Sequence, residues 1–172
     1  MNSAELLVDA FDRIREAVQE AVGGLTVEAL AFRVDPRANS IAWLIWHLTR
    51  IQDDHLAAAF STEQVWIVGR WVERFGLPFD PHAHGYGHTP DEVGAVRVSA
   101  DLLLGYHDAV HARTVQLLQD VTDADLDRVV DQRWDPPVKL GVRLVSVIAD
   151  DLQHAGQAAL IRGVHERNTA AK

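Results

Sequence analysis

Hydrophobic residues recur every three or four positions along most of the chain, which is the spacing of one face of an α-helix. The first stripe comprises Leu7, Ala10, Ile14, Ala17 and Ala21. Gly23-Gly24 ends this stripe. A second helix is predicted from Asn39 or Ser40, both good N-cap residues, to about Phe60. Its first half is apolar on every side, which predicts a position deep in a core or against a second subunit.

The helical spacing is interrupted between residues 61 and 88. We predict a short helix around 63–74, followed by a loop that carries His82, His84 and His88. A third long helix is predicted from Thr89, because Thr89 and Glu92 match a capping box and Pro90 suits the first turn. Its inner stripe runs from Val96 to Val121.

The last third of the chain predicts one more long helix. The polar stretch 122–128 predicts a helical turn, and Trp134-Asp-Pro-Pro predicts a sharp break. The fourth helix should then run from about Leu140 to Glu166. No segment shows the alternating pattern of a strand, so the fold class is all-α.

Four long amphipathic helices predict a four-helix bundle, formed as a single domain by residues 1–172. The connection between the second and third helices is roughly 30 residues, and connections of this length in compact domains tend to be functional. Such a long crossover also permits helices two and three to run parallel.

The composition of the chain excludes several classes of function. The chain has 172 residues and a formal net charge of -9, and an acidic protein repels nucleic-acid phosphates, so we expect no nucleic-acid partner. The absence of cysteine excludes disulfides, cysteine-ligated metal sites and a cysteine nucleophile. The N-terminus lacks the apolar core of a signal peptide, and the longest apolar run, Ser40–Leu48, is too short to span a bilayer. We therefore expect a cytoplasmic protein without membrane contact.

Three groups of histidines and acids lie on faces that should be buried. His47 lies in the apolar run of the second helix, where taken alone a core histidine bonded to a backbone carbonyl is the simpler interpretation. In the fourth helix Asp150 and His154 are four residues apart, a spacing that lets one metal ion bind both. The alternative is an ordinary contact between the two side chains, which is common at this spacing. Asp151, three residues before His154, fits nearly as well.

A competing pair occurs in the third helix, where His107 and His111 are also four residues apart. By spacing alone this pair is the cleaner metal motif, and the alternative is one core histidine beside one at its edge. The loop histidines resemble a metal-binding tract as well. We interpret them instead as polar groups that bond the backbone near Gly85 and Gly87.

Two segments resemble motifs of the DinB-like (DinB/YfiT) superfamily. They are Asn39-Ser-Ile-Ala-Trp-Leu-Ile-Trp-His47-Leu and Asp150-Asp-Leu-Gln-His154-Ala-Gly156-Gln157. WVERFGLPF, residues 71–79, and Gly85-Tyr-Gly-His-Thr-Pro are similar to segments of an actinobacterial branch of that family. The resemblance covers nearly the whole chain. It implies a four-helix bundle with a long crossover after the second helix.

The resemblance also implies a divalent metal ion held by His47, Asp150 and His154. Many members have a histidine where Asp150 stands, and a carboxylate there resembles the branch that includes mycothiol-dependent maleylpyruvate isomerase. Two imidazoles and one carboxylate leave a coordination position open, which is typical of catalytic zinc and also suits nickel or ferrous iron. In the thiol-dependent relatives the metal would hold a low-molecular-weight thiol.

We therefore expect a metal-dependent enzyme acting on a small-molecule substrate, first as a thiol transferase or isomerase and otherwise with hydrolase-like activity. By family analogy it would form a homodimer. The alternative is a non-catalytic, metal-binding or metal-stabilised dimer whose interface uses the second helix and an exposed region at Trp66 and Trp71.

Several further residues are candidates to line or orient the site, and the sequence assigns no role to them. They are Arg50, Asp54, His55, His107, Asp151 and Gln157, together with the loop 76–88, which could close over the site.

Overall fold

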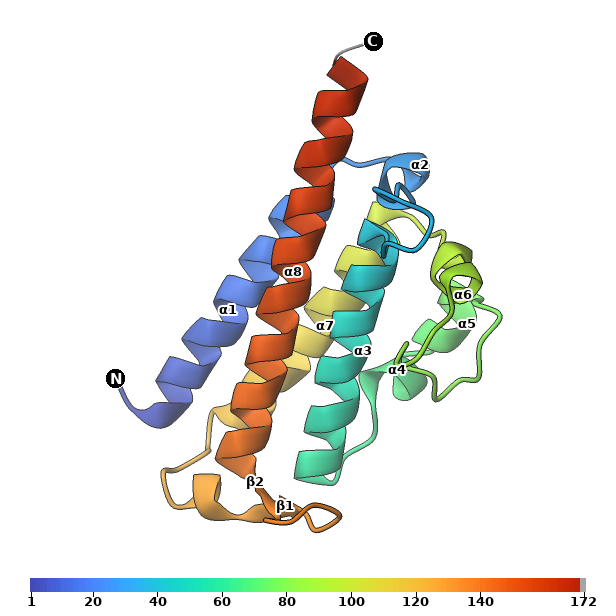
Figure 1. Ribbon diagram of the computed structural model, residues 1–172. Coiled ribbons are helices and arrows are strands. Elements are labelled where there is room, and N and C mark those ends of the chain that lie inside the picture. The colour runs from blue at the N-terminus through green and yellow to red at the C-terminus, as the bar shows by residue number, and fades with distance from the viewer. Residues whose placement is uncertain (171–172) are drawn as a thin grey trace.

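Four long helices dominate the computed structural model, which describes residues 1–170 (Figure 1). They are α1 (Ser3–Val22), α3 (Ile41–Phe60), α7 (Ala100–Leu118) and α8 (Leu140–Ala170). The short elements are α2 (Val27–Leu30), α4 (Val65–Val68), α5 (Trp71–Phe75), α6 (Pro90–Ala95), the 3₁₀ turn η1 (Asp125–Asp127), β1 (Val129–Asp131) and β2 (Val138–Lys139). The molecule is mostly helical, as predicted.

The long helices pack side by side around a common core. α8 contacts both α1 and α3, and α7 contacts the same two helices from the opposite side. Figure 1 shows α3 and α7 running in one direction and α1 and α8 in the other. Residues 61–99 join α3 to α7, and α4, α5 and α6 lie in this segment, which we call the crossover segment.

The apolar first half of α3 lies inside the core of the chain itself. Every residue from Ile41 to Arg50 is buried. Trp66 and Trp71 are buried too, with 3% and 7% of their surfaces exposed, so the predicted exposed interface at these tryptophans is wrong. They pack around Tyr106 of α7, and the crossover segment therefore covers α3 and α7.

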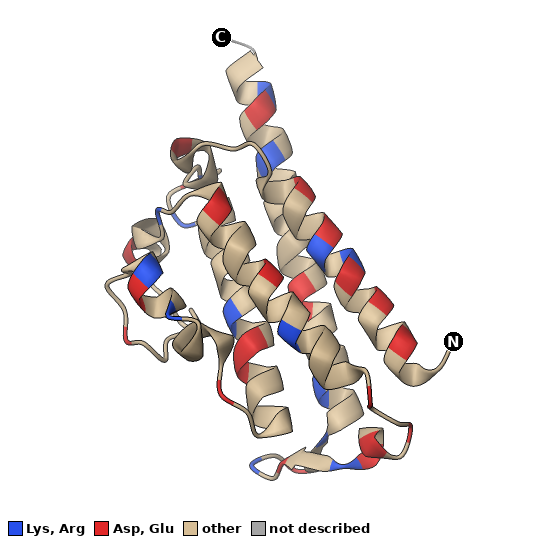
Figure 2. Ribbon diagram, turned by 180° about the vertical axis from the view of Figure 1, so that it is seen from behind, with Lys and Arg blue, Asp and Glu red and all other residues tan. Residues whose placement is uncertain are grey.

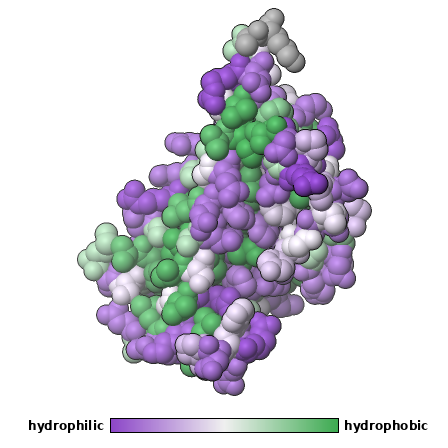
Figure 3. Space-filling model, viewed as in Figure 1, coloured by the Kyte–Doolittle hydropathy of each residue, from purple (hydrophilic) through white to green (hydrophobic). Residues whose placement is uncertain are grey.

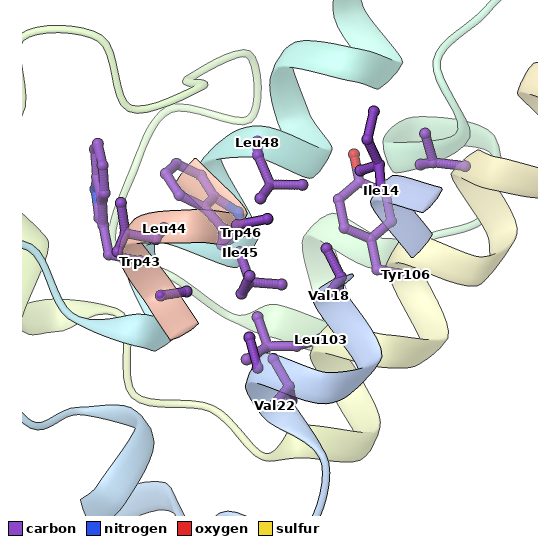
Figure 4. Close-up of a cluster of buried hydrophobic side chains, with 14 of the residues drawn as sticks. Ile14, Val18, Val22, Trp43, Leu44, Ile45, Trp46, Leu48, Leu103 and Tyr106 are labelled. Atoms are coloured by element: carbon purple, nitrogen blue, oxygen red, sulfur yellow. The ribbon is translucent and has the colours of Figure 1, made fainter. Parts of the chain in front are cut away.

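Figure 4 shows part of this core, where α1, α3 and α7 direct apolar side chains toward one another. The labelled residues are Ile14, Val18, Val22, Trp43, Leu44, Ile45, Trp46, Leu48, Leu103 and Tyr106. All of them are buried.

The predicted third helix is two helices. α6 starts at the predicted capping box of Thr89 and Glu92 but ends at Ala95, and α7 starts only at Ala100. Between them Val96 and Val98 are buried and Arg97 is exposed, which is the alternation of an extended segment. The side chain of Ser99 then caps α7 by accepting a hydrogen bond from the Leu102 amide.

The predicted short helix at 63–74 is also divided. It forms α4 and α5, separated at Gly69 and at Arg70, which has a left-handed φ of 53°. β1 and β2 form a small antiparallel hairpin where no strand was predicted. Strands of three and two residues are too short to show a period of two in the sequence.

Charged residues are spread over the molecule. Figure 2 shows acidic residues along α1 and α7, with arginines interspersed among them. Some form ion pairs between the helices, such as Arg15 with Asp108 at 2.6 Å. In the described part of the chain, no helix has the length and apolar character needed to cross a bilayer.

Candidate metal centre

The packing of α3 against α8 brings His47 beside Asp150 and His154. Each of the three side chains offers a ligand atom, and these atoms all lie within 4.8 Å of one another. The two imidazole rings are 4.9 Å apart between centroids. Among residues 1–170 this is the one group of three or more histidine or acidic side chains that could hold a metal ion.

His47 is held in one orientation by its surroundings. Its ring stacks on Trp43 at 4.6 Å, and its Nδ1 donates a hydrogen bond to the carbonyl oxygen of His84 in the crossover segment. Because a carbonyl only accepts, Nδ1 carries the proton and Nε2 keeps a free lone pair. Burial lowers the pKa of His47 to about 4, so the ring is neutral at pH 7, as a metal ligand must be.

Unpaired buried atoms on Asp150 and His154 are the clearest indication that a ligand binds here. Oδ2 of Asp150 and Nδ1 of His154 are buried and have no hydrogen-bond partner. Buried polar atoms are normally paired, since leaving one unpaired costs roughly 1–3 kcal/mol. Carboxylate oxygens and imidazole nitrogens are ligands of divalent cations such as zinc, so the residues present fit a divalent metal ion.

Arg50 and Asp53 of α3 hold the crossover segment beside the centre through hydrogen bonds. Arg50 is fully buried and donates from Nε to the carbonyl of Ala83 at 3.1 Å. The carboxylate of Asp53 accepts hydrogen bonds from the amides of Val65 and Trp66, the first two of α4. These contacts hold the residues that precede His84, and so support the hydrogen bond to His47.

Gly85 allows the segment to approach His47 closely. Its φ is +97°, a conformation that favours glycine. A Cβ atom placed there would lie 2.8 Å from His47 Nδ1 and 3.0 Å from both Trp43 and Trp46. Sequence reasoning treated Gly85 as a turn residue and did not find its contact with the centre. The sequence feature that could have indicated this contact is a glycine directly after a histidine, in a segment rich in glycine and histidine.

Among residues 1–170 the competing pair, His107 and His111, is not part of a group of three or more metal-ligating side chains. His107 is fully buried, and burial lowers its pKa to about 3. His111 instead pairs with Asp12 of α1, with Nε2 2.7 Å from Oδ1. Of the loop histidines, His82 is exposed, and Nδ1 of His88 accepts a hydrogen bond from the indole of Trp43 at 3.2 Å.

Asp150 and Asp151, which both suit the spacing to His154, lie in different surroundings. Asp150 joins the group, whereas Asp151 is fully buried on the inner face of α8. Burial, and after it the neighbouring Asp150, raises the pKa of Asp151 well above its usual value. Asp54 accepts a hydrogen bond from Gln64, and Gln157 is exposed, so neither belongs to the group.

A cleft of about 220 Å³ opens further along the groove between α3 and α8. His55, Arg143 and Asp131 line it together with the turn after β1. Arg143 bridges the other two, at 3.3 Å from His55 Nδ1 and 2.9 Å from Asp131. Burial lowers the pKa of His55, and the charge of Arg143 adds to this effect.

The model of the DinB superfamily matches residues 10–158. The chain belongs to the DinB superfamily. A solved structure, described as the conserved protein of a locus from Enterococcus faecalis, is 33% identical to this chain, with a TM-score of 0.87. The match covers 94% of this chain and 96% of that one. No curated protein matches the chain. The DinB superfamily is metal-associated, and the His/Asp/His group described above is where a metal could be held in this member.

Proposed function

We propose that this DinB-superfamily protein is a divalent-metal-dependent enzyme with His47, Asp150 and His154 as the metal ligands. The observation that carries the proposal is the convergence of one ligand atom from each of three side chains within 4.8 Å, together with a buried, unpaired atom on Asp150 and on His154. The parallel course of α3 and α7 supports a four-helix bundle with a long crossover, in which α3 and α8 present the ligands.

Zinc is the first candidate, and nickel or ferrous iron would suit the same ligands. An ion with an open coordination position supplies a Lewis acid that lowers the pKa of the water or thiol it binds. The chain contributes the ligand orientation: the His84 carbonyl fixes the tautomer of His47, and Trp43 stacks on the ring.

For the reaction we propose transfer or isomerisation that depends on a low-molecular-weight thiol of the mycothiol type. The carboxylate at Asp150 supports this, because it resembles the thiol-dependent branch of the family. The chain has no cysteine, so the thiol would have to come from a separate small molecule.

The first experiment measures the metal content of tag-free protein by elemental mass spectrometry. Wild type is compared with His47→Ala, Asp150→Asn and His154→Ala, and with His111→Ala as a control histidine outside the group. We expect close to one metal ion per chain in wild type and in the control, and loss in the other three. Wild type that contains no metal and takes up none from zinc, nickel or iron solutions would refute the proposal.

Exposed apolar residues favour one second candidate, a dimer whose role is binding rather than catalysis. Val145, Leu152 and Leu160 of α8 are each at least 45% exposed, and Figure 3 shows apolar surface over the α1–α8 face. A cleft of about 480 Å³ lies between these helices. Sedimentation of wild type and of Leu152→Glu would test whether the protein is a dimer. A monomeric wild type would exclude this second candidate function.

A further inference from the structure

One more imidazole lies near the candidate centre, and nothing described so far uses it. His84 is half-buried, and its Nδ1 is fully buried without a hydrogen-bond partner. The carbonyl of the same residue already serves His47. Because an unpaired buried nitrogen costs free energy, a hydrogen-bond partner for this nitrogen would stabilise the ring.

The backbone contacts of His84 and its neighbour place this residue beside the candidate centre. The His84 carbonyl accepts the hydrogen bond from His47 Nδ1, and a Cβ atom on the next residue, Gly85, would lie 2.8 Å from the same nitrogen. A nitrogen of His84 is not among the ligand atoms that lie within 4.8 Å of one another in the described residues, so direct ligation is not the contact that the geometry favours.

The backbone on both sides of His84 is tied down. The Pro81 carbonyl accepts from the indole of Trp66 at 2.9 Å, and the Ala83 carbonyl accepts from Arg50 at 3.1 Å. On the other side Gly85 packs against His47, and His88 bonds Trp43. The ring is thus presented by a rigid wall, which is the arrangement that favours binding without prior reorganisation.

We propose that His84 is a fourth protein residue of the metal centre, where its Nδ1 hydrogen-bonds to the water or thiol molecule that completes the coordination shell. The proposal rests on the proposed function, because it requires a metal ion at His47, Asp150 and His154. It adds a residue from the crossover segment to a centre otherwise built from α3 and α8.

Removal of the imidazole alone tests the proposal. His84→Ala keeps the carbonyl that binds His47 and every backbone contact of the segment. His84→Asn restores a polar atom bonded to Cγ, as Nδ1 is, and His82→Ala removes an exposed histidine two residues away. Zinc affinity is measured by competition with a chromophoric chelator, and thermal unfolding of the metal-free proteins verifies that the fold is kept.

We expect His84→Ala to bind zinc about 10- to 100-fold more weakly than wild type, the usual effect of losing a group that supports a metal site from outside its ligands. His84→Asn should recover most of the affinity, and His82→Ala should match wild type. The metal-free proteins should unfold at similar temperatures.

Three results would overturn the proposal while leaving the proposed function intact. They are equal zinc affinity in wild type and His84→Ala, equal losses in His82→Ala and His84→Ala, and a His84→Asn variant as weak as His84→Ala. The last would assign the effect to the packing of the ring instead of Nδ1. Wild type that binds no zinc would overturn the proposed function, and this proposal with it.

Discussion

Two glycines of the crossover segment allow the contact with His47 to be measured separately from backbone strain. Gly85 and Gly87 have φ values of +97° and +77°, so alanine is strained at either position. A left-handed conformation costs an L-residue roughly 1–2 kcal/mol. At Gly87 a new Cβ meets no atom within 4 Å, whereas at Gly85 it lies 2.8 Å from His47 Nδ1 and 3.0 Å from two indole rings.

Gly87→Ala should therefore lower the free energy of unfolding by about 1–2 kcal/mol through backbone strain alone. Gly85→Ala carries the same strain and adds overpacking of about 1–3 kcal/mol, because both tryptophans and His47 are buried and have little room to move. At this chain length, 1 kcal/mol corresponds to about 2–4 °C in Tm. Gly85→Ala should thus melt roughly 2–12 °C below Gly87→Ala.

The assay is urea unfolding followed by circular dichroism, supported by thermal melts. A chelator is present throughout, so that bound metal adds nothing to either stability. Equal losses of unfolding free energy in the two variants would refute the reasoning, because the segment would then not press on His47 as described. A larger loss in Gly87→Ala would refute it as well.

Three further outcomes are expected. Asp53→Ala leaves two backbone amides and the Tyr106 hydroxyl without their acceptor and removes the carboxylate that lies 3.8 Å from the buried Arg50, so it should lower the free energy of unfolding by about 3–5 kcal/mol in urea. The pKa of His107 is about 3 in the folded state and 6.5 ordinarily, so only the unfolded chain takes up this proton as pH falls from 6.5 toward 3. Wild type should then lose up to about 1.4 kcal/mol per pH unit more than His107→Leu, and parallel pH profiles in metal-free urea titrations would contradict this. Zinc at 100 times its Kd should stabilise wild type by about 2.7 kcal/mol in melts, and an equal gain in Asp150→Asn would exclude Asp150 as a ligand.

The long helices were predictable because burial imposes a period of 3.6 on any helix that packs on one face. Capping residues indicated where helices begin, since Ser40 and Thr89 cap α3 and α6 as expected. The break between α6 and α7 was not predictable from periodicity, since Val96 fits a helical stripe and an extended segment equally well. Ser99 was the one local signal, and it is a weak one inside an apolar pattern.

The candidate centre was predictable only in part. Spacing pairs His154 with Asp150 or Asp151, and it pairs His107 with His111 just as well, so only the family resemblance chose among them. The His84 carbonyl contacts His47 across 37 residues of sequence, through the path of the crossover segment. No local pattern encodes that path, because it depends on buried bonds such as the one from Arg50 to Ala83.

The carboxylate of Asp53 has a consequence for how the molecule fluctuates. It anchors the Val65 and Trp66 amides to the middle of α3, although these amides belong to a surface connection. Amides in such connections usually exchange hydrogen with solvent through cheap local openings. Here a local opening would break the hydrogen bonds that the buried Asp53 carboxylate accepts. Both amides should therefore exchange as slowly as those of the long helices. The crossover segment and the core would then open as one cooperative unit.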